Sequence, residues 1–98
     1  MDVLKKIEEV LNEAVLSPKK VIELLKKDKV GYGVRESFND EKDKMEYHVS
    51  KIDDLGEYER NKYWDIEDTY DNKTAAIEKA KQLAKADKSG IYIGFEKE

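Results

Sequence analysis

The sequence predicts one α+β domain over residues 1–98, with two N-terminal helices over 1–28 and a βββαβ unit over 30–98. Three observations support this fold class. Apolar residues first recur at three- and four-residue steps, as they do on one face of a helix. They then alternate with polar residues, as in strands, and a second helical period separates the last strand from the first three. The predicted order is ααβββαβ, in a chain long enough for one modest core.

Two helices are expected near the N-terminus, with a break between them at Ser17-Pro18. The first helix should cover residues 3–15, where the apolar stripe consists of Val3, Leu4, Ile7, Val10, Leu11, Ala14 and Val15. Serine is a good N-cap and proline is favoured at the first helical position, so a second helix should begin at Pro18 and end near Asp28. Its buried residues should be Val21, Ile22, Leu24 and Leu25.

A β-hairpin is expected next, because the apolar period changes from 3.6 to 2 at Val30. One face of the first strand carries Val30, Tyr32, Val34 and Phe38, and the other carries Gly31, Gly33, Arg35 and Ser37. Residues 39–44 form the polar turn. In the second strand the apolar residues Met45, Tyr47 and Val49 alternate with Glu46, His48 and Ser50. The paired glycines indicate that another backbone or a helix approaches that face closely.

A loop over residues 52–56 should lead to a third antiparallel strand, from about Tyr58 to Tyr70. Within it, Trp64 and Ile66 are expected to face the core, and Tyr63, Asp65 and Glu67 to face water. Asp71 or Asn72 should then cap a third helix over residues 73–85. The apolar stripe of this helix is rich in alanine, which allows close packing on a sheet. A last strand should contain Ile91, Ile93 and Phe95.

No residue pattern in the chain indicates catalysis. The absence of cysteine excludes disulfides, thiolate zinc sites and thiol nucleophiles. His48 is the only histidine, and its place among Glu46 and Ser50 on a polar strand face is typical of a solvated or structural side chain. Phosphate-loop, metalloprotease and nucleophile-elbow motifs do not occur. We therefore expect a protein that is not an enzyme, without cofactor or metal, and the lack of a signal peptide or long apolar run predicts a cytoplasmic location.

Negative charge is concentrated in the middle of the chain, although the whole protein has a net charge of only −4. Residues 36–72 hold thirteen acids and five bases. By contrast, residues 1–35 hold six acids and eight bases, and residues 73–98 hold four acids and six bases. The first three strands and their loops therefore carry the acidity, whereas the helices are mildly basic.

Acids in this middle region occur together with aromatic residues, which favours a partner-binding surface. Alternate residues of a strand stand roughly 6.5 to 7 Å apart, close to the spacing of successive phosphates along one nucleic-acid strand. A row of acids would thus mimic DNA toward a basic groove, and tyrosine would add rigid contact area. The predicted binding residues are Glu57, Glu59, Tyr63, Asp65, Glu67, Asp68, Tyr70 and Asp71. The same face also has a second interpretation, as a device that keeps the sheet soluble and prevents edge pairing.

These features, namely small size, no cysteine, an acid- and tyrosine-rich middle and no catalytic motif, resemble the small anti-defence proteins of bacteriophages and mobile elements. The resemblance covers the whole chain in size, composition and charge placement, and is greatest for anti-CRISPR proteins. Several anti-CRISPR proteins use acidic surfaces to occupy the DNA-binding groove of a nuclease. The resemblance therefore implies a phage-encoded inhibitor that acts in the host cytoplasm.

The sequence thus predicts a non-catalytic inhibitor that binds a basic, nucleic-acid-handling host protein, such as a CRISPR nuclease. It should act as a monomer or homodimer, without binding nucleic acid or membranes itself. The first alternative is a structural or regulatory domain that self-associates through its N-terminal helices. The second is a nucleic-acid binder that uses the lysines of the second helix, which are Lys19, Lys20, Lys26, Lys27 and Lys29.

Overall fold

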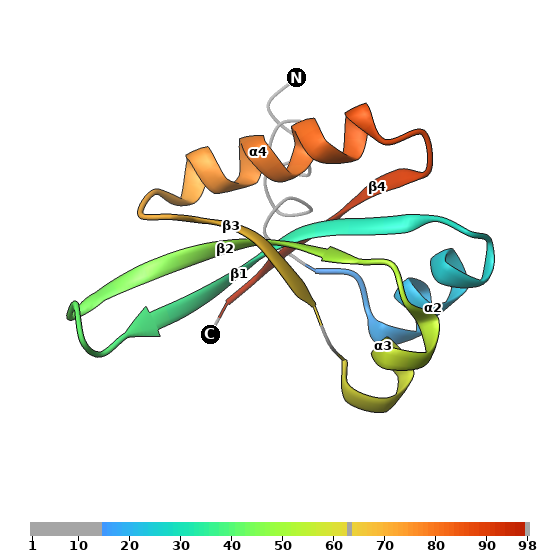
Figure 1. The fold of residues 1–98 in the computed structure, drawn as a ribbon, viewed down its shortest axis with the longest axis horizontal. Coiled ribbons are helices and arrows are strands. Elements are labelled where there is room, and N and C mark those ends of the chain that lie inside the picture. Colours follow the sequence, from blue (N-terminus) through green and yellow to red (C-terminus); the bar gives the residue numbers. More distant parts are fainter. Residues whose placement is uncertain (1–14, 63, 98) are drawn as a thin grey trace, which may run out of the picture.

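The computed structural model describes residues 15–62 and 64–97 and contains helices on both sides of one sheet (Figure 1). In chain order the elements are α2 (Pro18–Lys26), β1 (Val30–Asn39), β2 (Lys44–Ile52), α3 (Leu55–Asn61), β3 (Asp65–Tyr70), α4 (Lys73–Ala86) and β4 (Gly90–Glu96). The helix expected over residues 3–15 lies almost wholly outside the described residues, as does Tyr63.

The strands form a single mixed sheet in the order β3-β2-β1-β4. β2 pairs antiparallel with both β1 and β3, whereas β4 pairs parallel with β1. The α+β class is confirmed. The predicted ααβββαβ order is wrong in detail, because the short helix α3 lies between β2 and β3, and the antiparallel strands belong to a four-stranded mixed sheet.

Helix α4 covers one face of the sheet, which we call the α4 face (Figure 1). Ala76 and Ala80 are fully buried in this helix and bring its axis close to the strands, as the alanine stripe predicted. They form a core cluster with Val34, Val49 and Phe95, all at most 1% exposed. Asn72 caps α4 by accepting a hydrogen bond from the Ala75 N–H, one of the two capping residues expected.

The opposite face, which we call the open face, is covered only in part by α2 and α3. A second core cluster lies there and consists of Val21, Leu25, Ile52, Tyr58, Trp64 and Ile93. The strand face expected to be polar is therefore divided along its length. Near the start of β1, where it carries glycine, apolar residues from the helices pack on it; toward the hairpin turn it stays polar.

Gly33 is the point of closest packing on the open face, in agreement with the sequence interpretation. A Cβ atom at this position would lie 2.9 Å from the Gly94 carbonyl oxygen and 3.2 Å from a ring carbon of Trp64. Real Cβ atoms do not approach other atoms so closely without displacing them. The glycine thus allows β4 and the Trp64 ring to meet against β1.

The prediction of a strand beginning near Tyr58 is wrong, because residues 55–61 form helix α3. Asp54 caps this helix by accepting a hydrogen bond from the Glu57 N–H at 3.0 Å. Lys62 ends it in the left-handed conformation. An acid at the N-cap with glutamate three residues later is a helix-start pattern, and Tyr58 is buried from the helix rather than from a strand.

One of the two core residues expected in the third strand is exposed. Trp64 is buried, as predicted, but Ile66 is 57% exposed. The β-bulge in β3 does not cause this exposure, because the register shift between Val49 and Ser50 places the extra residue, Glu67, after Ile66. Ile66 lies on the open face, opposite Ser50, where neither α2 nor α3 covers it.

Candidate functional site

The eight predicted binding residues come from two elements rather than from one continuous strand. Glu57 and Glu59 belong to α3, and Asp65, Glu67, Asp68 and Tyr70 belong to β3. Asp71 follows β3 directly, and Tyr63 is outside the described residues. A single row of Glu59, Asp65 and Glu67 along one strand therefore does not exist, and regular phosphate-like spacing is not a property of this surface.

What joins these residues is the edge of the sheet. β3 is an outermost strand, and residues 65–69 are all exposed. Residues 53–71 contain eight carboxylates against two cations, Arg60 and Lys62. We call these carboxylates the acidic edge; they are Asp53, Asp54, Glu57, Glu59, Asp65, Glu67, Asp68 and Asp71.

Part of the acidic edge converges at the junction of β2, α3 and β3. Glu57 and Asp65, eight positions apart in the chain, line one hollow of about 130 Å³ together with Asp53 and Asp54. Lys51 is the cation at this hollow and lies 3.6 Å from the Asp53 carboxylate. The tertiary structure thus gathers acids from three elements at a place that the sequence alone did not identify.

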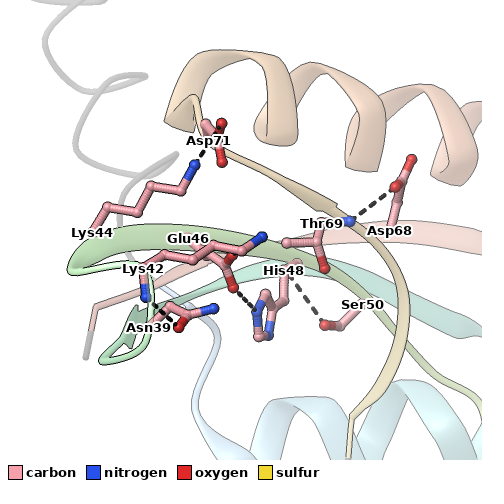
Figure 2. A network of polar contacts seen from close by, with 9 residues as sticks. All are labelled: Asn39, Lys42, Lys44, Glu46, His48, Ser50, Asp68, Thr69 and Asp71. Carbon is pink, nitrogen blue, oxygen red and sulfur yellow. Dashed lines mark hydrogen bonds and ion pairs between the residues drawn. The ribbon is translucent and has the colours of Figure 1, made fainter.

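Several carboxylates of the acidic edge have structural partners. Asp54 caps α3, Asp68 accepts a hydrogen bond from the Thr69 N–H at 2.9 Å, and Asp71 is 3.0 Å from the Lys44 ammonium (Figure 2). Arg60 is 3.2 Å from Glu57.

Glu59 and Glu67, by contrast, form no ion pair with any other described residue.

Tyr70 differs from the exposed acids around it. It is half-buried beside the core cluster under α4 and faces Tyr47 across the strand pair. Burial, followed by a hydrogen bond to Asp68, raises the pKa of its hydroxyl. Because much of its ring already packs within the domain, Tyr70 offers less contact area to a partner than the sequence suggested.

The sequence interpretation missed a groove on the uncovered part of the open face. The groove has a volume of about 520 Å³, and Arg35, His48, Ser50, Trp64, Ile66 and Glu96 are among the residues that line it. Arg35 lies over the Trp64 ring at 4.8 Å and forms an ion pair of 2.6 Å with Glu96. Arg35 and His48 were assigned to the polar strand face, but nothing in the sequence placed Trp64 against them.

The polar residues near the groove contact one another and the backbone. The His48 ring lies 3.6 Å from the Glu46 carboxylate, and the fully buried Ser50 donates its hydroxyl hydrogen to the His48 carbonyl oxygen (Figure 2). No nucleophile–base hydrogen bond joins Ser50 to the His48 ring in the part of the chain that the structure describes. Over the same residues there is no group of three or more potential metal ligands.

Among residues 15–62 and 64–97, no helix is both long and apolar enough to cross a membrane. Comparison of the chain with protein-family models, with curated proteins and with solved structures gives no match. The functional interpretation therefore depends on the site itself.

Proposed function

We propose that this protein is a non-catalytic, protein-binding inhibitor that uses the acidic edge to block a basic, nucleic-acid-handling protein. The observation that carries the proposal is the concentration of eight carboxylates, against two cations, on α3, β3 and their flanking turns. A CRISPR nuclease, with its basic nucleic-acid groove, is the specific partner to test first.

Physical reasons connect this surface to a basic partner. A field of one sign speeds encounter with a surface of the opposite sign and disfavours partners of like charge. Glu59 and Glu67 have no described ion-pair partner to lose, so less internal pairing must be broken when they meet a partner cation. The proposal depends on charge density rather than on a regular ladder of acids, since a β-bulge interrupts β3.

Self-association through the N-terminal helices has less support. The most buried residues of α2, Val21 and Leu25, pack inside the domain against Ile52, Tyr58 and Trp64. That part of the helical pair is therefore already used within one chain. The remaining part of this alternative concerns residues 1–14, which lie outside the described residues.

The proposal is tested by affinity capture from a bacterial lysate, and against purified CRISPR nucleases, with the bait tagged at its C-terminus. Bound protein is eluted by a salt step, because screening weakens contacts between charged surfaces. The variant Glu59→Lys, Asp65→Lys, Glu67→Lys reverses three acids of the edge. The matched control, Glu23→Lys, Glu41→Lys, Glu78→Lys, makes the same change in net charge at exposed positions on other elements.

We expect the edge variant to lose affinity for the captured partner by about a hundredfold, whereas the control should bind as the unmodified protein does. Circular dichroism should show that both variants remain folded. Equal loss in the two variants would mean that net charge alone matters. Unchanged binding in the edge variant, or an empty capture, would leave the acids as a solubility device and overturn the proposal.

A further inference from the structure

We infer that the outer side of helix α2 binds the phosphate backbone of nucleic acid. This inference goes beyond the proposed function and differs from the sequence-based expectation that the chain does not bind nucleic acid itself. Three observations carry it, namely the number of cations on this helix, their lack of partners among the described residues, and their arrangement in two rows.

Positive charge is concentrated on α2 and the residues directly after it. Residues 18–29 hold five lysines and two acids, a net charge of +3 in a protein whose total is −4. Four of these lysines are exposed, and we call them the basic face; they are Lys19, Lys20, Lys26 and Lys27. The basic face is thus a local exception to the overall charge of the protein.

The lysines of the basic face have no counter-charge in the described part of the chain. None of the ion pairs between described residues involves a residue of the range 15–34. On the hairpin, by contrast, Lys42, Lys44 and Lys51 each lie 3.0 to 3.8 Å from a carboxylate. The basic face can therefore meet an external anion without first breaking a described ion pair.

Helix stability accounts for only part of this charge. Cations in the last turn of a helix interact favourably with the helix dipole, whereas cations in the first turn interact unfavourably. Lys26 occupies the last turn, but Lys19 and Lys20 occupy the first turn, which contains no acid. Two exposed cations thus lie where the helix itself disfavours them, which favours a role in binding.

The basic face consists of two rows of lysine. Lys19 and Lys26 are seven residues apart, as are Lys20 and Lys27, so the members of each row lie about 10.5 Å apart along one side of the helix. Glu23 is three or four residues from all four lysines and therefore lies between the rows. Rows of single cations suit a chain of phosphates, which lysine contacts as a point charge.

The apolar side of α2 argues against a membrane surface as the occupant. A helix that lies in a membrane interface inserts its apolar residues among the lipids. In α2 the buried residues Val21 and Leu25 pack inside the domain against Ile52, Tyr58 and Trp64. Only the charged side of the helix is left for a partner.

The position of α2 connects the basic face to the acidic edge. α2 packs beside α3, which carries Glu57 and Glu59 of that edge (Figure 1). Two neighbouring surfaces of opposite sign fit a partner that carries both signs, as a basic protein with bound nucleic acid does, whereas a bare basic surface would repel the lysines. The choice of nucleic acid over other polyanions therefore rests on the proposed function.

The test uses the full chain and a fluorescent single strand of thymidine nucleotides, with binding followed by anisotropy at increasing salt. The variant Lys20→Gln, Lys27→Gln removes one row of the basic face. Its control, Lys85→Gln, Lys88→Gln, makes the same change in net charge at exposed positions on α4 and directly after it.

Salt dependence counts the phosphate contacts, since each one contributes about −0.7 to the slope of log affinity against log salt for a single strand. Four lysines predict that affinity falls about fiftyfold between about 50 and 200 mM salt, and the double variant should lose only about sevenfold. The control variant should keep the slope of the unmodified protein.

Glu23→Gln provides a test in the opposite direction. This variant should bind the strand about twofold more tightly, because a carboxylate between the rows repels the phosphates. Glu41→Gln makes the same change in charge in the hairpin turn and should have no effect. A gain in affinity at position 23 alone is not expected if the lysines only keep α2 soluble.

Failure to bind the strand at low salt, or an equal loss in the two lysine variants, would overturn the inference. Equally tight binding of a glutamate homopolymer or of anionic lipid vesicles would also overturn it, since the basic face would then not distinguish nucleic acid. The proposed function is tested separately by the capture experiment, in a lysate depleted of nucleic acid because the capture control carries Glu23→Lys on the basic face. Loss of partner binding there would leave the binding of the strand unchanged.

Discussion

The two faces of the sheet are built differently although the same four strands form both. The α4 face is closed by one helix whose alanines let it lie close, and Val34, Val49 and Phe95 are almost completely buried there. The open face is closed only where α2 and α3 reach, and the rest remains a groove with polar walls. We infer from this contrast that the α4 face supplies most of the stability, while part of the open face and the adjoining β3 strand remain exposed to solvent.

The largest expected effect sharpens this contrast by comparing one residue from each face. Phe95→Ala should lower the free energy of unfolding by about 3 to 5 kcal/mol, because the ring is buried and its removal leaves a cavity. Ile66→Ala should change it by no more than about 0.5 kcal/mol, since its side chain already lies largely in water. Urea denaturation measures both values. Similar losses in the two variants would contradict the division of roles between the faces.

A smaller effect is expected from two glycines that meet different surroundings. Gly33→Ala should cost about 1 to 3 kcal/mol of unfolding free energy, because its Cβ would crowd Gly94 and Trp64 on the open face. Gly56→Ala, within α3, should instead stabilise by about 0.5 to 1 kcal/mol, since alanine favours the helix and its Cβ would be 3.4 Å from the nearest atom, a terminal nitrogen of Arg60. Urea denaturation of each variant tests the two predictions: the midpoint should fall for Gly33→Ala and rise for Gly56→Ala. If Gly33→Ala stabilised the protein, Gly94 and Trp64 would not be packed tightly against position 33.

The smallest expected effect on stability at neutral pH comes from two tyrosines of the α4 face, which become important only at alkaline pH. Burial, and next the hydrogen bond that its hydroxyl donates to Asp87 at 2.8 Å, raise the pKa of Tyr32 to about 12. Burial raises the pKa of Tyr92 to about 12 as well. Both hydroxyls have an ordinary pKa of 10.0. Their contribution to the free energy of unfolding is therefore fully present below pH 10 and is lost as the pH rises toward 12.

Alkaline unfolding should therefore be steep between pH 10 and 12 in the unmodified protein. The double variant Tyr32→Phe, Tyr92→Phe should unfold with a shallower dependence on pH over that range, because it has two fewer groups to ionise. Fluorescence of the buried Trp64 reports the transition. An identical pH profile in the double variant would show that these tyrosines do not carry the alkaline sensitivity.

The elements with strong local signals were predictable from the sequence. Ser17 and Pro18 predicted the start of α2, and the structure confirms both the cap and the proline at the first turn. Strict alternation predicted the hairpin of β1 and β2, including which residues share a face. The alanine stripe predicted α4. In each case the signal lies within a few residues, so the local pattern and the tertiary structure agree.

The region between Asp53 and Tyr70 was predicted poorly, and for a physical reason. Both the helix α3 and the edge strand β3 are largely exposed, so neither has the long apolar pattern by which a helix and a strand are told apart. The Asp54 and Glu57 capping pair was the one signal that would have identified α3. Counting placed Ile66 on the same face as Trp64, but whether a helix covers that part of the face depends on tertiary structure, so the exposure of Ile66 could not be predicted.

The sequence by itself determined the α+β class, the caps of α2 and α4, the hairpin and the concentration of acid in the middle of the chain, since these depend on neighbouring residues. Only the tertiary structure decided that the acids lie at a sheet edge, that Glu57 and Asp65 share one hollow, and that Trp64 closes a groove with Arg35. Those relations depend on strand order and register, which are set by contacts between residues distant in the chain.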